Sequence, residues 1–175
     1  MLVILLIAIA AMLADQVTKL LTVGFFVDPE RMLVTGLLHE PGDSVTLIPD
    51  VFSFTYVLNK GAAFGILQNQ RFFFLIVTVA ICAVGTVLLL RIKKKHWVLK
   101  LASGLIFGGA LGNLIDRLVI GSVRDFLDAS FVQTITGYAF PVFNLADMCV
   151  VVGTVLLAIY ILFLHEKQIK QDGKP

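Results

Sequence analysis

Two aspartates, Asp125 and Asp147, have the side-chain type and the placement that acid–base chemistry requires. Asp125 lies in Gly121-Ser-Val-Arg-Asp-Phe126, and Asp147 lies in Phe143-Asn-Leu-Ala-Asp147. The chain around them is strongly apolar, and a carboxylate at the centre of a membrane helix is unfavourable by roughly 2.5–3.5 kcal/mol. An acid in such surroundings indicates function, and two acids that flank one loop predict a pair that shares a proton.

A carboxylate pair with one proton suits more than one function. In peptide hydrolysis, the ionised carboxylate activates water, while the protonated one polarises the carbonyl and later protonates the leaving amine. In a transporter or channel, the same pair would carry protons or ions. A structural subunit of a membrane assembly is a third hypothesis, but it gives no reason for two acids to converge. The residue types alone leave peptidase and transporter open.

Other catalytic chemistries find less support in the sequence. The histidines His39, His96 and His165 lie between or beyond the apolar stretches, so no Ser or Cys nucleophile has a His base nearby. Cys82 and Cys149 lie within apolar stretches and are expected to be small buried side chains. Because Asn and Arg residues lie near the aspartates, a metal site built from carboxylates alone is less favoured. We expect neither a metal nor an organic cofactor.

The composition is typical of a polytopic membrane protein. The chain has 175 residues, of which 58% are hydrophobic and 15% charged, and its mean hydropathy is +0.95. A bilayer needs about 20 apolar residues per helix. We therefore expect residues 1–175 to form one membrane domain, an all-α bundle whose four transmembrane helices span about 2–26, 72–90, 98–120 and 142–164. A cleavable signal peptide is the alternative for the first stretch, although no Lys or Arg precedes it.

The basic residues predict the orientation of these helices. Five of them lie in the link 91–100 between the second and third stretches, and three lie in the tail beyond residue 165. By the positive-inside rule, this link and both termini are expected in the cytoplasm. The segments at about 27–71 and 121–141 then face outward. Because the net charge is only +2 and the basic residues are localised, nucleic-acid binding is not expected.

The longer outward segment is expected to form a small β-sheet. Apolar and polar residues alternate from Val45 to Tyr56, which is the period of a strand with one buried face. Asn59-Lys60-Gly61 follows with residues that favour a turn. We therefore expect the outward segment at about 27–71 to be β-rich and to form a small extracytoplasmic sheet at the membrane surface.

Polar residues in three of the predicted helices are expected at one depth, in the outer third of the membrane. Asp15 and Lys19 are four residues apart and can form an ion pair, with direct contact to substrate as the alternative. Asp116 and Arg117 could neutralise one another, or Arg117 could hold a backbone carbonyl or a phosphate. The polar residues expected around the two aspartates are Asn113, Asp116, Arg117 and Asn144, with Asp15 and Lys19 at the same depth.

A stripe of small residues predicts close helix packing. Gly104, Gly108 and Gly112 recur every four residues in the third stretch, and Gly109 widens the same groove. Small residues on one face let membrane helices approach closely. We expect this stripe to be a packing seam.

Five sequence blocks span nearly the whole chain. They are Asp15-Gln-Val-Thr-Lys19, Asn59-Lys-Gly-Ala-Ala-Phe64, Gly108-Gly-Ala-Leu-Gly-Asn-Leu-Ile-Asp-Arg117, Val123-Arg-Asp-Phe126 and Phe143-Asn-Leu-Ala-Asp147. Together, and in this order, they resemble the lipoprotein signal peptidase (signal peptidase II) family.

The resemblance implies an aspartyl endopeptidase of the bacterial inner membrane. Its substrates would be diacylglyceryl-modified prolipoproteins, cut just before the lipidated Cys, its inhibitor would be globomycin, and it would need no cofactor. Asp125 and Asp147 match the catalytic pair, and the outward sheet matches the family's cradle. Residues matched to the substrate and inhibitor site or to supporting roles are Asn59, Gly61, Asn113, Asp116, Arg117, Asn144, Asp15 and Lys19. Besides membrane lipids we expect no further partner, and we expect a monomer.

Arg124 departs from the family pattern, in which the residue before this aspartate is more often apolar. We expect its side chain to point to lipid headgroups or water. The alternative is an inward orientation, in which the cation would lower the pKa of Asp125.

Overall fold

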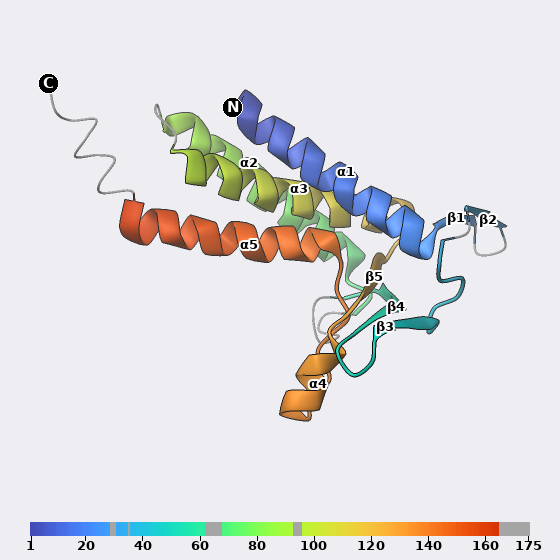
Figure 1. The fold of residues 1–175 in the computed structure, drawn as a ribbon. Helices are drawn as coiled ribbons and strands as arrows, with labels where there is room; N and C mark the ends of the chain where they lie inside the picture. The colour runs from blue at the N-terminus through green and yellow to red at the C-terminus, as the bar shows by residue number, and fades with distance from the viewer. Residues whose placement is uncertain (29–30, 35, 62–67, 93–95, 165–175) are drawn as a thin grey trace, which may run out of the picture.

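The computed structural model describes residues 1–28, 31–34, 36–61, 68–92 and 96–164. Each of its four long helices is long and apolar enough to cross a membrane. They are α1 (Leu2–Val23), α2 (Arg71–Arg91), α3 (Trp97–Val119) and α5 (Leu145–Ile159), which continues into a π-helical turn at Tyr160–Leu164. They form one bundle, with the β-strands at one end (Figure 1). The predicted class, a helical membrane bundle with a small sheet, is confirmed.

The middle of the bundle is α3, which packs against both α1 and α5, while α2 packs mainly against α3. Glycines of α3 allow this close approach. A Cβ on Gly104 would lie 2.6 Å from Cβ of Ile7, and one on Gly112 would lie 2.5 Å from Oδ2 of Asp15. Gly109 faces the other neighbour, α5, where a Cβ would meet Val150. The predicted packing seam is therefore confirmed, and it positions polar side chains of α1 against α3.

Two helix ends differ from the prediction, and capping residues explain both. The first helix ends at Val23 rather than near residue 26, because Gly24 adopts a φ of 78° that side-chain-bearing residues rarely adopt. The chain then forms the hairpin of β1 (Phe25–Asp28) and β2 (Arg31–Val34). The last helix begins at Leu145 rather than near residue 142, because the side chain of Asn144 caps it.

The larger sheet has three antiparallel strands in the order β3–β4–β5. The alternating segment forms two of them, β3 (Ser44–Ile48) and β4 (Phe52–Asn59), which a turn separates at Asp50, where φ is 59°. The third, β5 (Val123–Asp128), pairs Asp125 with Val57. The outward segment at 121–141, for which the sequence predicted no strand or helix, contains β5 and the short helix α4 (Ser130–Thr136). Pairing with β4 satisfies backbone groups that an open edge would leave exposed.

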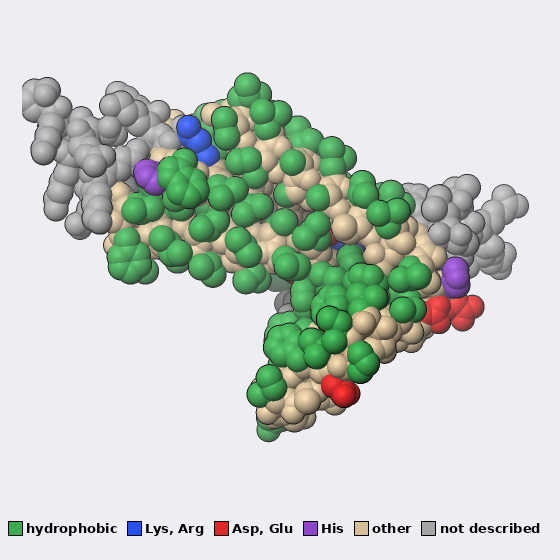
Figure 2. All heavy atoms as spheres, in the orientation of Figure 1, with side chains coloured by type: hydrophobic (Ala, Val, Ile, Leu, Met, Phe, Trp, Pro, Cys, Tyr) green, Lys and Arg blue, Asp and Glu red, His purple; other side chains and the backbone are tan. Residues whose placement is uncertain are grey.

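Two apolar clusters hold the ends of the bundle. One lies at the end away from the sheet and joins Ile4, Leu89, Leu99 and Tyr160, while the other packs the sheet against the end of α1. Between them the bundle surface is largely hydrophobic, and the acidic side chains visible in Figure 2 lie on the part that carries the sheet and α4. Lys93–Lys95 and the tail from His165, both central to the predicted topology, lie outside the described residues.

Candidate active site

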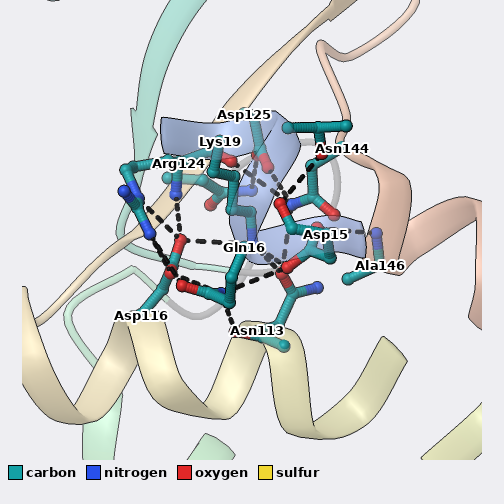
Figure 3. A network of polar contacts seen from close by, with 12 residues as sticks. Asp15, Gln16, Lys19, Asn113, Asp116, Arg124, Asp125, Asn144 and Ala146 are labelled. Carbon is teal, nitrogen blue, oxygen red and sulfur yellow. Dashed lines mark hydrogen bonds and ion pairs between the residues drawn. The ribbon is translucent and has the colours of Figure 1, made fainter. Parts of the chain in front are cut away.

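A buried polar network lies where α1, α3, α5 and β5 meet, at the sheet end of the bundle (Figure 3). Its members come from four segments, and α1 lies about 100 residues before α3 and β5 in the sequence. The side chains that are at most 1% exposed are Asp15, Lys19, Asp116, Arg124, Asp125 and Asn144. The predicted convergence of polar side chains from three helices is therefore confirmed.

The innermost part of the network is an ion-pair cluster around Lys19. Its Nζ lies 2.9 Å from Oδ2 of Asp15 and 3.2 Å from Oδ2 of Asp116. The other oxygen of Asp15 accepts a hydrogen bond of 2.9 Å from the backbone N–H of Ala146. The predicted pairing of Asp15 with Lys19 is confirmed, and it also binds the start of α5 to α1.

Arg124 completes this cluster from β5. Its Nη2 lies 2.8 Å from Oδ1 of Asp116, and its Nη1 donates to the carbonyl of Gly24 at 2.7 Å. The expectation that Arg124 points to headgroups or water is wrong. The alternative was right about its inward orientation, but its carboxylate partner is Asp116 rather than Asp125. Burial of a guanidinium is tolerable here because an acid and a carbonyl both accept its hydrogen bonds.

Arg117 has a different role from the suggested pairing with Asp116. Its Nη2 donates to the carbonyl of Gly61 at 3.1 Å, and its guanidinium carbon lies 4.6 Å from the ring centroid of Phe74. The suggestion that Arg117 holds a backbone carbonyl is confirmed. Gly61 also donates its N–H to Oδ1 of Asn59 at 2.9 Å, which forms the predicted turn after β4.

Asp125 and Asp147 form a second pair of carboxylates, which we call the dyad. Oδ2 of Asp125 accepts a hydrogen bond from Nδ2 of Asn59 at 3.0 Å, and Oδ1 accepts one from Nδ2 of Asn144 at 2.6 Å. Oδ1 of Asp147 accepts from Nδ2 of Asn113 at 2.7 Å. Its Oδ2 accepts from the backbone N–H of Asn144 at 3.1 Å. Asn144 therefore links the two acids, and all four carboxylate oxygens face neutral donors.

The surroundings of the dyad favour retention of a proton. Burial, followed by the negative charge of Asp147, raises the pKa of Asp125 to about 7, although hydrogen bonds from Asn59 and Asn144 act in the opposite direction. The charge count of the whole site agrees with this. Among the residues that the structure describes, the acids Asp15, Asp116, Asp125 and Asp147 face three cations, Lys19, Arg117 and Arg124, so one bound proton makes the site neutral.

Comparison with known proteins identifies the family. The family model described as "Signal peptidase (SPase) II" matches residues 7–163. The chain belongs to the signal peptidase II family. It is therefore a protease, and its four long apolar helices agree with a multi-pass membrane protein of bacteria.

Relatives and solved structures resemble this family member over nearly its full length. The lipoprotein signal peptidase of Symbiobacterium thermophilum is 43% identical over 162 residues, which are 91% of this chain and 94% of that protein. The lipoprotein signal peptidase of Desulfitobacterium hafniense is 41% identical over 158 residues, which are 90% and 91% of the two chains. A solved bacterial membrane enzyme has a TM-score of 0.73 at 33% identity, covering 98% of this chain and 91% of its own.

Two residues of the buried polar network in this signal peptidase II family member were not predicted from the sequence to belong to it. One is Arg124, and the other is Gln16, whose Nε2 donates to Oδ1 of Asp116 at 3.1 Å and to the carbonyl of Gly112 at 3.0 Å. Its Oε1 accepts from Nη2 of Arg124 at 3.0 Å. A signal for Gln16 was present, because a polar amide beside Asp15 in an apolar helix needs partners.

The two histidines that the structure describes lie apart from the dyad, as expected. His39 is exposed, and His96 caps the start of α3 at the opposite end of the bundle. His165 lies outside the described residues. Within the ranges that the structure describes, no three His, Cys, Asp or Glu side chains form a group that could hold a metal ion.

Proposed function

We propose that this signal peptidase II family member is an aspartyl endopeptidase that releases the signal peptide from diacylglyceryl-modified prolipoproteins just before the lipidated Cys. The observation that carries the proposal is the dyad, whose carboxylates share Asn144 and have only neutral hydrogen-bond donors. The names of the relatives as lipoprotein signal peptidases support the substrate class.

The roles of the two acids follow from their surroundings. Asp147 lies in the first turn of α5, where the helix dipole favours a negative charge, so it is the member that accepts a proton from water. Asp125, with its pKa of about 7, holds the proton in the resting site. It donates this proton to the oxygen of the scissile carbonyl as water attacks the carbon.

The second half of the reaction returns both protons. The tetrahedral diol collapses, the carbon–nitrogen bond breaks, and Asp147 gives the proton taken from water to the leaving amine. The remaining hydroxyl proton returns to Asp125, which restores the resting site. Asn59, Asn113 and Asn144 keep the carboxylates in place, while Arg117 holds the chain at Gly61 beside them.

The position of the site agrees with a substrate that is itself a membrane helix. The dyad lies at the sheet end of the bundle, whereas α1 begins and α5 ends at the other end (Figure 1). With both termini and the basic link on the cytoplasmic side of a bacterial inner membrane, the dyad would face the outer side of that membrane. There an unwound scissile segment can lie between the sheet and the membrane. Globomycin would compete with the substrate for this position.

The deciding experiment is cleavage of a synthetic diacylglyceryl prolipoprotein peptide by the purified protein. We expect Asp125→Asn and Asp147→Asn each to lower kcat/KM by about 10³-fold or more, because general acid–base groups contribute on this scale. Asp128→Asn is the matched control, since Asp128 lies on the same strand and bonds to Thr55 at 3.0 Å outside the network.

Turnover near the wild-type rate by either dyad variant would overturn the proposal. In that case, proton flux into liposomes that depends on Asp147 would favour the transporter hypothesis instead. A normal rate for Asp128→Asn shows that loss of an acid from β5 does not by itself impair the enzyme.

A further inference from the structure

We infer that Arg124 is a positioning residue, which keeps the dyad at one shared proton and in its working geometry by neutralising Asp116. This inference rests on the proposed function, because it concerns the protonation of the same dyad. Arg124 immediately precedes Asp125 in the chain, yet its guanidinium points away from that carboxylate and into the ion-pair cluster.

The first support is the number of hydrogen bonds that fix Arg124. Its backbone N–H donates to Oδ2 of Asp116 at 2.9 Å, and its Nε donates to the same oxygen at 3.3 Å. Its remaining nitrogens bond to Gly24 at the end of α1 and to Gln16 one turn before Lys19. The residue before Asp125 is therefore attached to both α1 and α3, which fixes β5 at the point where Asp125 leaves it.

The second support is a chain of contacts from Asp116 to the dyad. Oδ2 of Asp116 is shared between Arg124 and Lys19, and Lys19 also donates to Oδ1 of Asn113 at 3.0 Å. Lys carries only donors, so Asn113 must turn its oxygen to Lys19 and its amide nitrogen to Asp147. Without Arg124, the charge of Asp116 would draw Lys19 away from Asn113.

The third support is the charge balance of the site. With Arg124 present, the three cations balance four acids that share one proton. Loss of Arg124 leaves one uncompensated negative charge, and a negative charge makes proton uptake by nearby acids more favourable. On β4, Tyr56 faces the same cluster, but burial raises its pKa to about 12, so it stays neutral at working pH. Asp116 and Asp15 still pair with Lys19, whereas the dyad has only neutral hydrogen-bond donors, so the dyad is the group that takes up a further proton.

The test is the pH profile of kcat/KM for the full-length protein with Arg124→Gln and Arg124→Lys. Gln removes the charge but keeps a donor, so we expect both limbs of the bell-shaped profile to move to higher pH by roughly half to one unit. Lys keeps the charge but lacks the planar guanidinium with its several N–H donors. We therefore expect both limbs to keep their wild-type pH values and kcat to fall several-fold. A residue that only stabilised the fold would lower the active fraction without moving either limb.

A double variant separates charge balance from other effects. Asp116→Asn combined with Arg124→Gln removes one charge of each sign, so we expect both limbs to return to the wild-type positions. Limbs that stay shifted in the double variant, or that do not move in Arg124→Gln, would overturn the inference. If Arg124→Gln does not fold, Asp116→Asn replaces it: its limbs must move to lower pH, and unmoved limbs would overturn the inference.

The dyad variants keep this test distinct from that of the proposed function. If Asp125→Asn and Asp147→Asn cleave substrate normally, the proposed function itself is wrong. If both are inactive while the Arg124→Gln profile equals that of the wild type, only the role of Arg124 is wrong.

Discussion

The site contains two pairs of acids that differ in their partners. Asp15 and Asp116 are bound by the cations Lys19 and Arg124 and have side chains with no exposed surface. Asp125 and Asp147 are bound by amide groups, and among the described residues neither has a Lys or Arg within salt-bridge distance. A paired cation holds an acid in its ionised form, whereas a neutral donor leaves both protonation states accessible. The first pair is suited to hold the fold, and the second is suited to exchange protons.

The largest expected effect separates activity from stability at the dyad. Asp125→Asn removes the group proposed to hold the proton, so the more than 10³-fold loss of kcat/KM should come without loss of fold. The raised pKa of Asp125 means that its ionised form destabilises the folded protein. The stability that protonated Asp125 contributes is therefore lost as the pH rises from about 4, its pKa in the unfolded chain, to about 7, its pKa in the folded protein. The neutral amide removes this pH dependence.

Thermal unfolding in detergent between pH 4 and pH 8 measures this difference. We expect the Tm of Asp125→Asn to equal or exceed that of the wild type at pH 8, with a smaller difference at pH 4. A variant that is less stable than the wild type at pH 8 would mean that Asp125 supports the fold, and the contrast between the pairs would fail.

The second effect should be on stability, at the cation-bound pair. Asp116→Asn leaves Lys19 and Arg124 without their shared carboxylate, and removal of one partner from a buried ion pair typically destabilises by about 3–5 kcal/mol. Equilibrium unfolding of the purified variant measures this loss. Asp128→Asn is again the control, because Asp128 is only half-buried and should change stability by less than about 1 kcal/mol. An equal effect of the two substitutions would contradict the distinction.

A third, smaller effect should connect helix packing to the cation-bound pair. A Cβ on Gly112 would lie 2.5 Å from Oδ2 of Asp15, so Gly112→Ala must displace the acid that binds Lys19. Overpacking typically destabilises by about 1–3 kcal/mol. Gly85→Ala on α2 is the control, because its Cβ would meet only the ring edge of Phe107, 2.9 Å away, which can move. Comparable Tm losses in both variants would show that the position next to Asp15 has no special role.

The sequence predicted the parts of this site that depend on helix geometry. The fixed rise and repeat of a helix determine which residues share a depth and a face, and so Asp15 with Lys19, and Asn113 with Asn144, were correctly brought together. The lengths of the apolar stretches likewise predicted the long helices, and the helix ends at Gly24 and Asn144 differ from the predicted ends by about one turn each.

Strand pairing set the limit of what the sequence could predict. Residues 123–126 are buried on both faces of β5, so the alternation of a half-exposed strand is absent and the side of Arg124 could not be read from it. The partner of β5 is β4, more than 60 residues earlier, and no local pattern encodes that pairing. Arg124 was therefore assigned to the surface, although the excess of acids over cations in the predicted site called for a further cation.

The smallest expected effect concerns a single amide next to the dyad. Asn59 donates to Oδ2 of Asp125 at 3.0 Å, and a hydrogen bond to an ionised carboxylate favours that form. Asn59→Ala should therefore raise the pKa of Asp125 further, and move the basic limb of kcat/KM upward from near pH 7 by roughly half a unit. The acidic limb should stay, because Asn59 makes no bond to Asp147.

Gln133→Ala, which removes an exposed amide from α4, should leave both limbs in place. Movement of both limbs in Asn59→Ala would mean that the two acids respond as one group, and that amide bonds do not assign the proton to Asp125.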